Sequence, residues 1–179
     1  MENKTFKDYA LLDFKKDKYF YLVNNDKVDT YLNLAIEDGK SKAILFKDKN
    51  LEKELLKNNI KLIYSDNDSK YTGLVIYART ILTNKNICIE IFNKAIKEKA
   101  ERLNLDYDTL IKLHLAHEFF HALEYKDNCL TSSKVEPIYQ KLLFFKVKRE
   151  LSSLNEIAAN SFAYYYLDAT IIPQSTDIY

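Results

Sequence analysis

Residues that form turns or crosslink chains are scarce in this sequence. Its 179 residues include two glycines, two prolines, two cysteines and no tryptophan. Because tight turns depend on glycine and proline, this scarcity argues against an all-β fold with many turns and favours helices. Two cysteines exclude a scaffold held by several disulfides, so we interpret Cys88 and Cys129 as reduced, packed thiols.

An excess of one charge sign and long apolar runs are also missing. The chain has 27 Lys and Arg against 26 Asp and Glu, a balance that argues against nucleic-acid or membrane partners. No segment has the apolar length of a membrane span, and residues 1–20 lack the apolar core of a signal peptide. We therefore expect a cytoplasmic protein with no nucleic-acid and no membrane partner.

The patterns along the chain predict one α+β domain over residues 1–179. A mostly helical part is expected over 1–59, with a helix over 28–38 ended by Gly39, a short strand over 43–46, and a helix over 50–58 capped by Asn50. The core is expected over 60–173, beginning with a small antiparallel sheet of three strands, at 60–64, 74–82 and 87–92. Helices are expected to follow, at 94–103, 108–125, 136–151 and 153–169.

The three histidines of the chain, although few, all fall between positions 114 and 121. His117-Glu118-Phe119-Phe120-His121 forms an H-E-x-x-H motif within an apolar, helical stretch. Side chains four apart on a helix share one face, so His117 and His121 could hold one Zn²⁺, with Glu118 beside the metal-bound water. Such a short motif also occurs by chance, and buried histidines are often only hydrogen-bonded. The concentration of rare histidines favours the metal site.

A catalytic zinc needs a third protein ligand, and the sequence offers three candidates. Asp127 could bind the metal only if the chain turned sharply after Tyr125, and no glycine at position 124 prepares that turn. Glu124 lies on the same helix face as His117 and His121, but its position favours a contact with a metal ligand over direct binding of the metal. Glu156 lies on the next helix, where Ala159 would allow close packing. A capping box, Ser153-x-x-Glu156, is the competing explanation of Glu156.

Two further residues are candidates for supporting roles. Asn160, one helical turn after Glu156, could orient a metal ligand through its amide. His114 lies one turn before His117, too far along the helix axis for easy ligation, so we expect it to line or support the site.

The two segments together resemble the ImmA/IrrE-type zinc metallopeptidases. The resemblance rests on Leu115-Ala116-His117-Glu118-x-x-His121-Ala122-Leu123 and on Glu156-x-x-Ala159-Asn160-x-Phe162-Ala163, and extends over residues 60–173. It implies a zincin-like fold, Zn²⁺ bound by His117, His121 and Glu156, and Glu118 as the catalytic carboxylate. It further implies that the substrate is a cytoplasmic transcriptional repressor, often one with a helix-turn-helix domain.

The sequence departs from that family at three places. Phe120 replaces a frequent glycine and is expected to narrow the cleft, Ala158 replaces a frequent acidic residue, and the segment between His121 and Glu156 is long.

The function indicated is zinc-dependent hydrolysis of peptide bonds in a protein substrate. The oxyanion-stabilising residue cannot be chosen among fourteen tyrosines, which include Tyr164, Tyr165 and Tyr166. The alternative is a non-catalytic, zinc-stabilised interaction protein such as a toxin–antitoxin component. DNA binding is the weakest hypothesis, because the basic residues between 141 and 149 are expected to form a solvated helix face.

Overall fold

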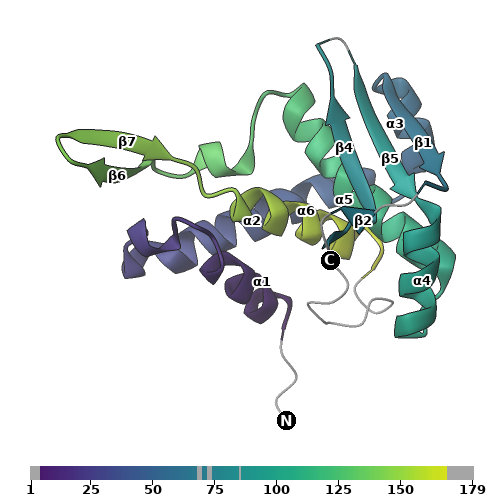
Figure 1. The fold of residues 1–179 in the computed structure, drawn as a ribbon, viewed down its shortest axis with the longest axis horizontal. Coiled ribbons are helices and arrows are strands. Elements are labelled where there is room, and N and C mark those ends of the chain that lie inside the picture. The colour runs from purple at the N-terminus through teal and green to yellow at the C-terminus, as the bar shows by residue number, and fades with distance from the viewer. Residues whose placement is uncertain (1–4, 68–69, 72–73, 85, 169–179) are drawn as a thin grey trace.

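The α+β architecture predicted from the sequence is confirmed by the structure. The computed structural model describes residues 5–67, 70–71, 74–84 and 86–168. Six α-helices lie in these residues: α1 (Phe6–Lys15), α2 (Asn25–Phe46), α3 (Leu51–Lys57), α4 (Asn93–Leu103), α5 (Tyr107–Lys126) and α6 (Ser153–Tyr166). The strands are β1 (Ile60–Ser65), β2 (Lys70–Tyr71), β3 (Leu74–Val75), β4 (Ala78–Leu82), β5 (Ile87–Phe92), β6 (Ile138–Leu142) and β7 (Phe145–Arg149). Short 3-10 helices occupy Phe20–Leu22 and Thr131–Lys134 (Figure 1).

The three-stranded sheet is mixed, so the expected antiparallel sheet is wrong in part. Its order is β1-β5-β4, with β4 antiparallel and β1 parallel to β5. The short connection between β4 and β5 makes them an antiparallel hairpin, and β1 pairs with the edge of β5 that β4 leaves free. The expected strand over 74–82 is divided into β3, which pairs with β2, and β4, so β4 forms one edge of the main sheet.

Helix α2 is longer than the sequence predicts. It continues through Gly39 to Phe46, so both the predicted helix end at Gly39 and the predicted strand over 43–46 are wrong. Gly39 lies where α2 crosses α6, and a Cβ there would clash with the carbonyl oxygen of Ala158 and lie 2.7 Å from the nitrogen of Phe162. Its role is close helix packing rather than a left-handed helix end. This crossing helps fix the position of α6.

The expected helix over 136–151 is wrong, because this segment forms the β6–β7 hairpin. In β7, Phe145 and Val147 alternate with Lys146 and Lys148, a period of two that belongs to a strand. The turn at Leu143–Phe144 contains neither glycine nor asparagine, so the usual hairpin signal is missing from the sequence. The hairpin extends away from the body of the molecule (Figure 1).

Helices α5 and α6 pack together through fully buried aromatic side chains. Phe119 and Phe120 of α5 lie with ring centroids 6.0 and 5.8 Å from that of Phe162 in α6. Phe120 therefore packs in the core and does not narrow the cleft as expected. Helix α6 ends at Tyr166, and position 169, where the sequence predicted its end, lies outside the described residues, as do 169–173 of the expected core. No helix in the described part of the chain is long and apolar enough to cross a membrane.

Candidate metal centre

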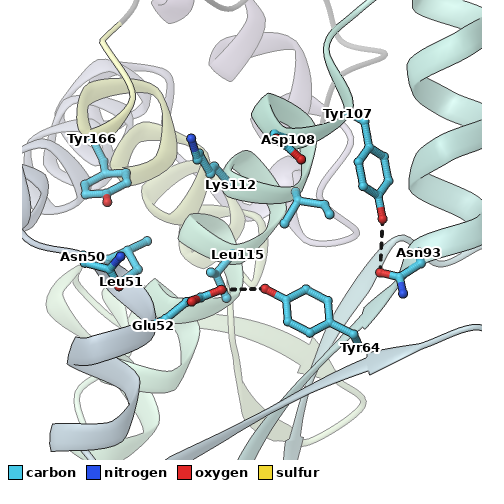
Figure 2. Close-up of a pocket in the computed structure, with 11 residues that line it drawn as sticks. Asn50, Leu51, Glu52, Tyr64, Asn93, Tyr107, Asp108, Lys112, Leu115 and Tyr166 are labelled. Atoms are coloured by element: carbon cyan, nitrogen blue, oxygen red, sulfur yellow. Dashed lines mark hydrogen bonds between the residues drawn. The ribbon is translucent and has the colours of Figure 1, made fainter.

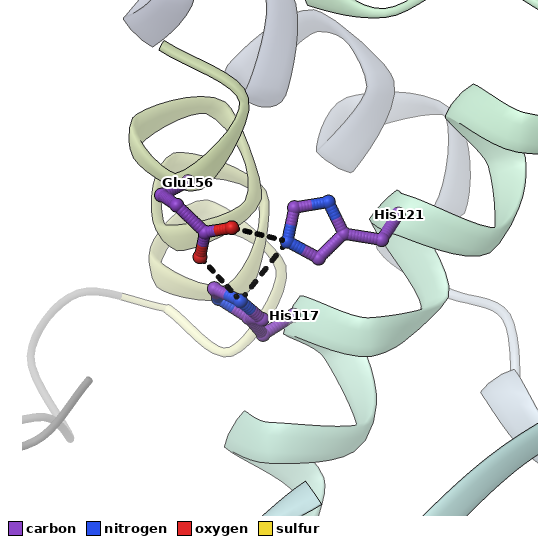
Figure 3. Close-up of side chains that lie close together, drawn as sticks. All are labelled: His117, His121 and Glu156. Carbon is purple, nitrogen blue, oxygen red and sulfur yellow. Dashed lines mark hydrogen bonds and ion pairs between the residues drawn. The ribbon is translucent and has the colours of Figure 1, made fainter. Parts of the chain in front are cut away.

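Three side chains from α5 and α6 point at one another and form what we call the metal cluster: His117, His121 and Glu156 (Figure 3). The two Nε2 atoms are 3.2 Å apart. Glu156 places Oε2 at 3.3 Å from Nε2 of His117 and Oε1 at 3.5 Å from Nε2 of His121. The side chains of both histidines are mostly buried, whereas that of Glu156 is 60% exposed. The cluster therefore lies at the edge of the core, open on its carboxylate side.

The spacing of these atoms suits a metal ion. Two ligands at about 2.0–2.1 Å from a tetrahedral ion lie roughly 3.3 Å apart, close to the three distances observed. Two imidazole nitrogens and a carboxylate oxygen are also the donor set of several catalytic zinc sites. This group could hold a metal ion and leave a fourth position open.

The other ring nitrogen of each histidine has its own partner. Nδ1 of His117 lies 2.7 Å from Oδ1 of Asn160, and Nδ1 of His121 lies 3.1 Å from Oε2 of Glu124. Glu124 is fully buried and accepts hydrogen bonds from the backbone N–H and the hydroxyl of Thr131. Because oxygen atoms accept from Nδ1–H, each imidazole would leave Nε2 free for a metal ion when that ion takes the place of the proton on Nε2. Asn160 and Glu124 thus fix the orientation of the two imidazole rings.

The electrostatics of the cluster favour a cation. Burial lowers the pKa of His121, but hydrogen bonds with Glu124 and Glu156 and the charges of Glu156 and Glu118 outweigh it and raise this pKa to about 10. Burial raises the pKa of Glu156, but hydrogen bonds with His117 and His121 and their charges outweigh it and lower this pKa far below its usual range. Positive charge is therefore stabilised between these groups, and a divalent cation held there would supply it in place of the imidazole proton.

Glu118, the carboxylate of the H-E-x-x-H motif, is positioned by the neighbouring sheet. The hydroxyl of Thr80 in β4 donates to Oε2 of Glu118 at 2.7 Å and lies 3.1 Å from its backbone carbonyl oxygen. Oε2 is therefore anchored, while Glu118 remains one wall of the cleft that contains the metal cluster. Glu118 therefore lines the same cleft as the metal cluster but is not one of its three donor residues.

A cleft of about 210 Å³ surrounds these residues. Its lining combines the metal cluster with Glu118, the β4 residues Ala78, Arg79 and Thr80, and Tyr125. Tyr125 is 44% exposed. Burial and the charges of Glu124, Glu156, Glu150 and Glu118 raise the pKa of its hydroxyl, which stays protonated and able to donate at neutral pH.

Sequence reasoning missed Tyr125 and Thr80. Tyr125 could have been found, because it lies four residues after His121 and so shares a helix face with it. Thr80 could not, because only the packing of β4 against α5 brings it to Glu118.

The structure does not contain the capping box that competed with the metal-ligand role of Glu156, and it places the other two candidate ligands, Asp127 and Glu124, outside the metal cluster. Helix α6 begins at Ser153 with Ser152 as N-cap and no side-chain cap, so the Ser153–Glu156 capping box does not form. Asp127 is the C-cap of α5 and does not join the metal cluster, and Glu124 contacts His121 through Nδ1.

His114 lies apart from the metal cluster and does not line its cleft. The ring is buried, stacks on Tyr77 with centroids 5.2 Å apart, and places Nε2 at 3.3 Å from Nζ of Lys99. Burial, followed by the charges of Lys99 and His117, lowers the pKa of His114 well below its usual value, so the neutral ring accepts from the Lys99 ammonium. The contacts of His114 are therefore with Tyr77 and Lys99, and it belongs neither to the metal cluster nor to the lining of its cleft.

The opposite face of α5 lines a larger pocket of about 490 Å³ (Figure 2). Here Tyr64 donates to Glu52 at 2.8 Å, and Tyr107 donates to Asn93 at 3.3 Å. We nevertheless assign the functional site to the smaller cleft, because its donor atoms converge on one point.

No protein-family model, curated protein or solved structure matches this chain. Its function must be inferred from the site itself.

Proposed function

We propose that this protein is a zinc-dependent metalloendopeptidase that hydrolyses peptide bonds of a protein substrate in the cytoplasm. The observation that carries the proposal is the convergence of His117 and His121 with Glu156, beside a Glu118 that is not a ligand. A purely structural zinc site uses four protein ligands and has no open position. This cluster offers three donors, and a further carboxylate, Glu118, lies in the same cleft. The two motifs also support membership of the ImmA/IrrE-type metallopeptidases and a zincin-like arrangement.

The residues of the cleft have distinct roles in this proposal. When bound by the metal cluster, Zn²⁺ supplies Lewis acidity toward water and the scissile carbonyl. Glu118 accepts a proton from the attacking water at its carboxylate and later delivers it to the nitrogen of the leaving amine. The anchor from Thr80 holds the carboxylate in place for both transfers.

Tyr125 is our candidate for stabilising the oxyanion. Tyr125 lines the same cleft, and its hydroxyl is protonated at neutral pH. The hydroxyl can therefore donate a hydrogen bond to the carbonyl oxygen of the scissile bond as negative charge develops on that oxygen.

Strand β4 is our candidate for the substrate-binding edge. In the described residues β4 pairs only with β5, and Ala78, Arg79 and Thr80 line the cleft. An edge strand offers backbone N–H and C=O groups that an extended peptide can pair with. The resemblance to ImmA/IrrE-type enzymes makes a transcriptional repressor with a helix-turn-helix domain the proposed substrate class.

The test compares wild type with Glu118→Gln, both loaded with zinc. We expect zinc-dependent cleavage of a peptide mixture by the wild type, read by mass spectrometry, and a loss of about 10²–10⁴-fold in the variant with its zinc content unchanged. A variant that cleaves as well as the wild type would exclude the mechanism. Fully zinc-loaded wild type without any cleavage would favour the zinc-stabilised interaction protein instead.

A further inference from the structure

The β6–β7 hairpin ends in four consecutive apolar residues, which we call the apolar tip: Leu142, Leu143, Phe144 and Phe145. Leu143 is 95% and Phe144 97% exposed, and Phe145 is 74% exposed. The hairpin extends away from the rest of the molecule, so the tip is far from the core that buries most large side chains (Figure 1). Scattered exposed apolar residues are ordinary, but a contiguous group at the end of a projection marks an interaction site.

The backbone of the tip is strained as well. Leu143 has a φ of 53°, in the left-handed region that a bulky side chain adopts only at a cost. Two-residue hairpin turns favour Asn-Gly, which adopts this conformation easily and is soluble. The chain instead has Leu143-Phe144 at these positions. This pair makes the turn conformation less favourable and exposes two large apolar side chains to water. Strain that persists beside exposed apolar groups points to a function of the tip.

Behind the tip, the hairpin carries positive charge and no acidic residue. Lys141 and Lys146 lie directly opposite each other in the ladder, and Lys148 lies opposite Tyr139. Like charges in this position repel, and no acidic side chain in the described part of the chain forms an ion pair with these three lysines. An anionic surface would relieve the repulsion.

The geometry of the tip favours a lipid surface over a protein groove. Paired residues lie on the same face of a hairpin, so Leu142 and Phe145 share one face, and Leu143 and Phe144 form the turn at its end. The three lysines share the other face. A bilayer that the hairpin enters end-on takes up the whole tip and leaves the lysines at the level of the lipid phosphates, whereas a protein groove over the apolar face would leave the lysines in water. The ladder continues to the pair Leu142–Phe145, so only the two turn residues would carry unpaired backbone groups into that region.

We propose that this hairpin docks the protein on membranes that contain anionic lipids. The apolar tip inserts at the level of the upper acyl chains, and Lys141, Lys146 and Lys148 bind lipid phosphates, with Tyr139 at the interface. The contact is peripheral and reversible. The expectation of no membrane partner depended on net charge and spanning segments, neither of which tests a hairpin tip.

The experiment measures flotation of the full chain with phosphatidylcholine vesicles, with and without phosphatidylglycerol. We expect binding only to the anionic vesicles, and weaker binding at high salt. The double substitution Leu143→Asn/Phe144→Gly should weaken it about tenfold or more, because it removes the inserted side chains. Asn-Gly suits the turn, so the thermal midpoint should stay the same or rise, which separates lost binding from lost folding.

The charge contribution is tested by Lys141→Gln/Lys146→Gln, which should weaken binding to anionic vesicles about tenfold or more. The matched control is Lys47→Gln/Lys53→Gln, which removes the same charge from exposed positions outside the hairpin and should bind like the wild type.

Three results would overturn the proposal. One is equal binding to neutral and anionic vesicles, and another is unchanged binding by the Asn-Gly variant. The third is no vesicle binding at all by the wild type, accompanied by a dimer that the Asn-Gly variant dissociates, because the tip would then join two copies of the chain. None of these results bears on the zinc site.

Discussion

The two faces of α5 present polar side chains in different ways. On one face, His117 and His121 meet Glu156 from α6, and their donor atoms lie within 4.8 Å of one another. On the other face, Lys112 lines a larger pocket in which the polar groups bond in separate pairs, Tyr107 with Asn93 and Tyr64 with Glu52. Convergence of donors, rather than pocket volume, therefore marks the site that could hold a metal ion.

The largest expected difference between the faces is in metal binding. Glu156→Ala removes one of the three proposed ligands, and we expect zinc affinity to fall by more than the roughly 10–100-fold typical of losing an orienting group. Lys112→Ala, on the opposite face, should leave it unchanged. Metal analysis of both purified variants, with titration by a competing chelator, measures this. Retained zinc in Glu156→Ala would mean that a different group completes the site.

A second comparison uses one tyrosine from each of the two pockets that α5 lines. Tyr125→Phe should lower kcat for peptide hydrolysis by about 10²-fold with little change in KM, because its hydroxyl is needed only as the oxyanion forms. Tyr107→Phe should leave kcat unaltered. Steady-state kinetics on a single cleaved peptide would show this, and equal kinetics for the two variants would remove Tyr125 from the mechanism.

Two asparagines provide the next test. Asn160 accepts from Nδ1 of His117, so Asn160→Ala should reduce zinc affinity about 10–100-fold while the fold persists. Asn93→Ala removes an acceptor for Tyr107 and should not change zinc affinity. If both variants bind zinc like the wild type, the orientation of His117 does not depend on this amide.

The smallest effect concerns the ionisation of Tyr64, which lines the larger pocket. Burial, then the hydrogen bond to Glu52 and its charge, raise the pKa of Tyr64 to about 12. A raised pKa means that the folded state holds this proton more tightly than the unfolded state does. The resulting stabilisation is fully present below the ordinary tyrosine pKa near 10 and is lost as pH rises through about 12. The tyrosinate absorbance of wild type minus Tyr64→Phe should titrate near 12, and a midpoint near 10 would contradict the contact.

Local patterns were sufficient for several parts of the fold. The capping oxygen of Asn50 accepts from the backbone of Lys53, and β5 and the helix that carries His117 lie where the sequence predicts them. These features depend on residues within a few positions of one another, so their signals are local.

Predictions failed where a distant partner decides the conformation. Gly39 reads locally as a helix end, but α6 packs against it and the helix continues. The hairpin was predicted as a helix because its turn residues, Leu143 and Phe144, are those least expected in a tight turn. The parallel direction of β1 follows from its pairing with the later strand β5, which no local pattern encodes.

By itself, the sequence determined the chemistry available to this protein: two histidines one helical turn apart, a carboxylate between them and an acidic residue on a later helix. Helix periodicity imposes the first spacing, so it can be read from residue numbers alone. Only the tertiary structure brought Glu156 to within 3.3 Å of His117 and anchored Glu118 to Thr80. Those contacts join segments far apart along the chain, and the packing of α6 and of β4 against α5 sets their distances.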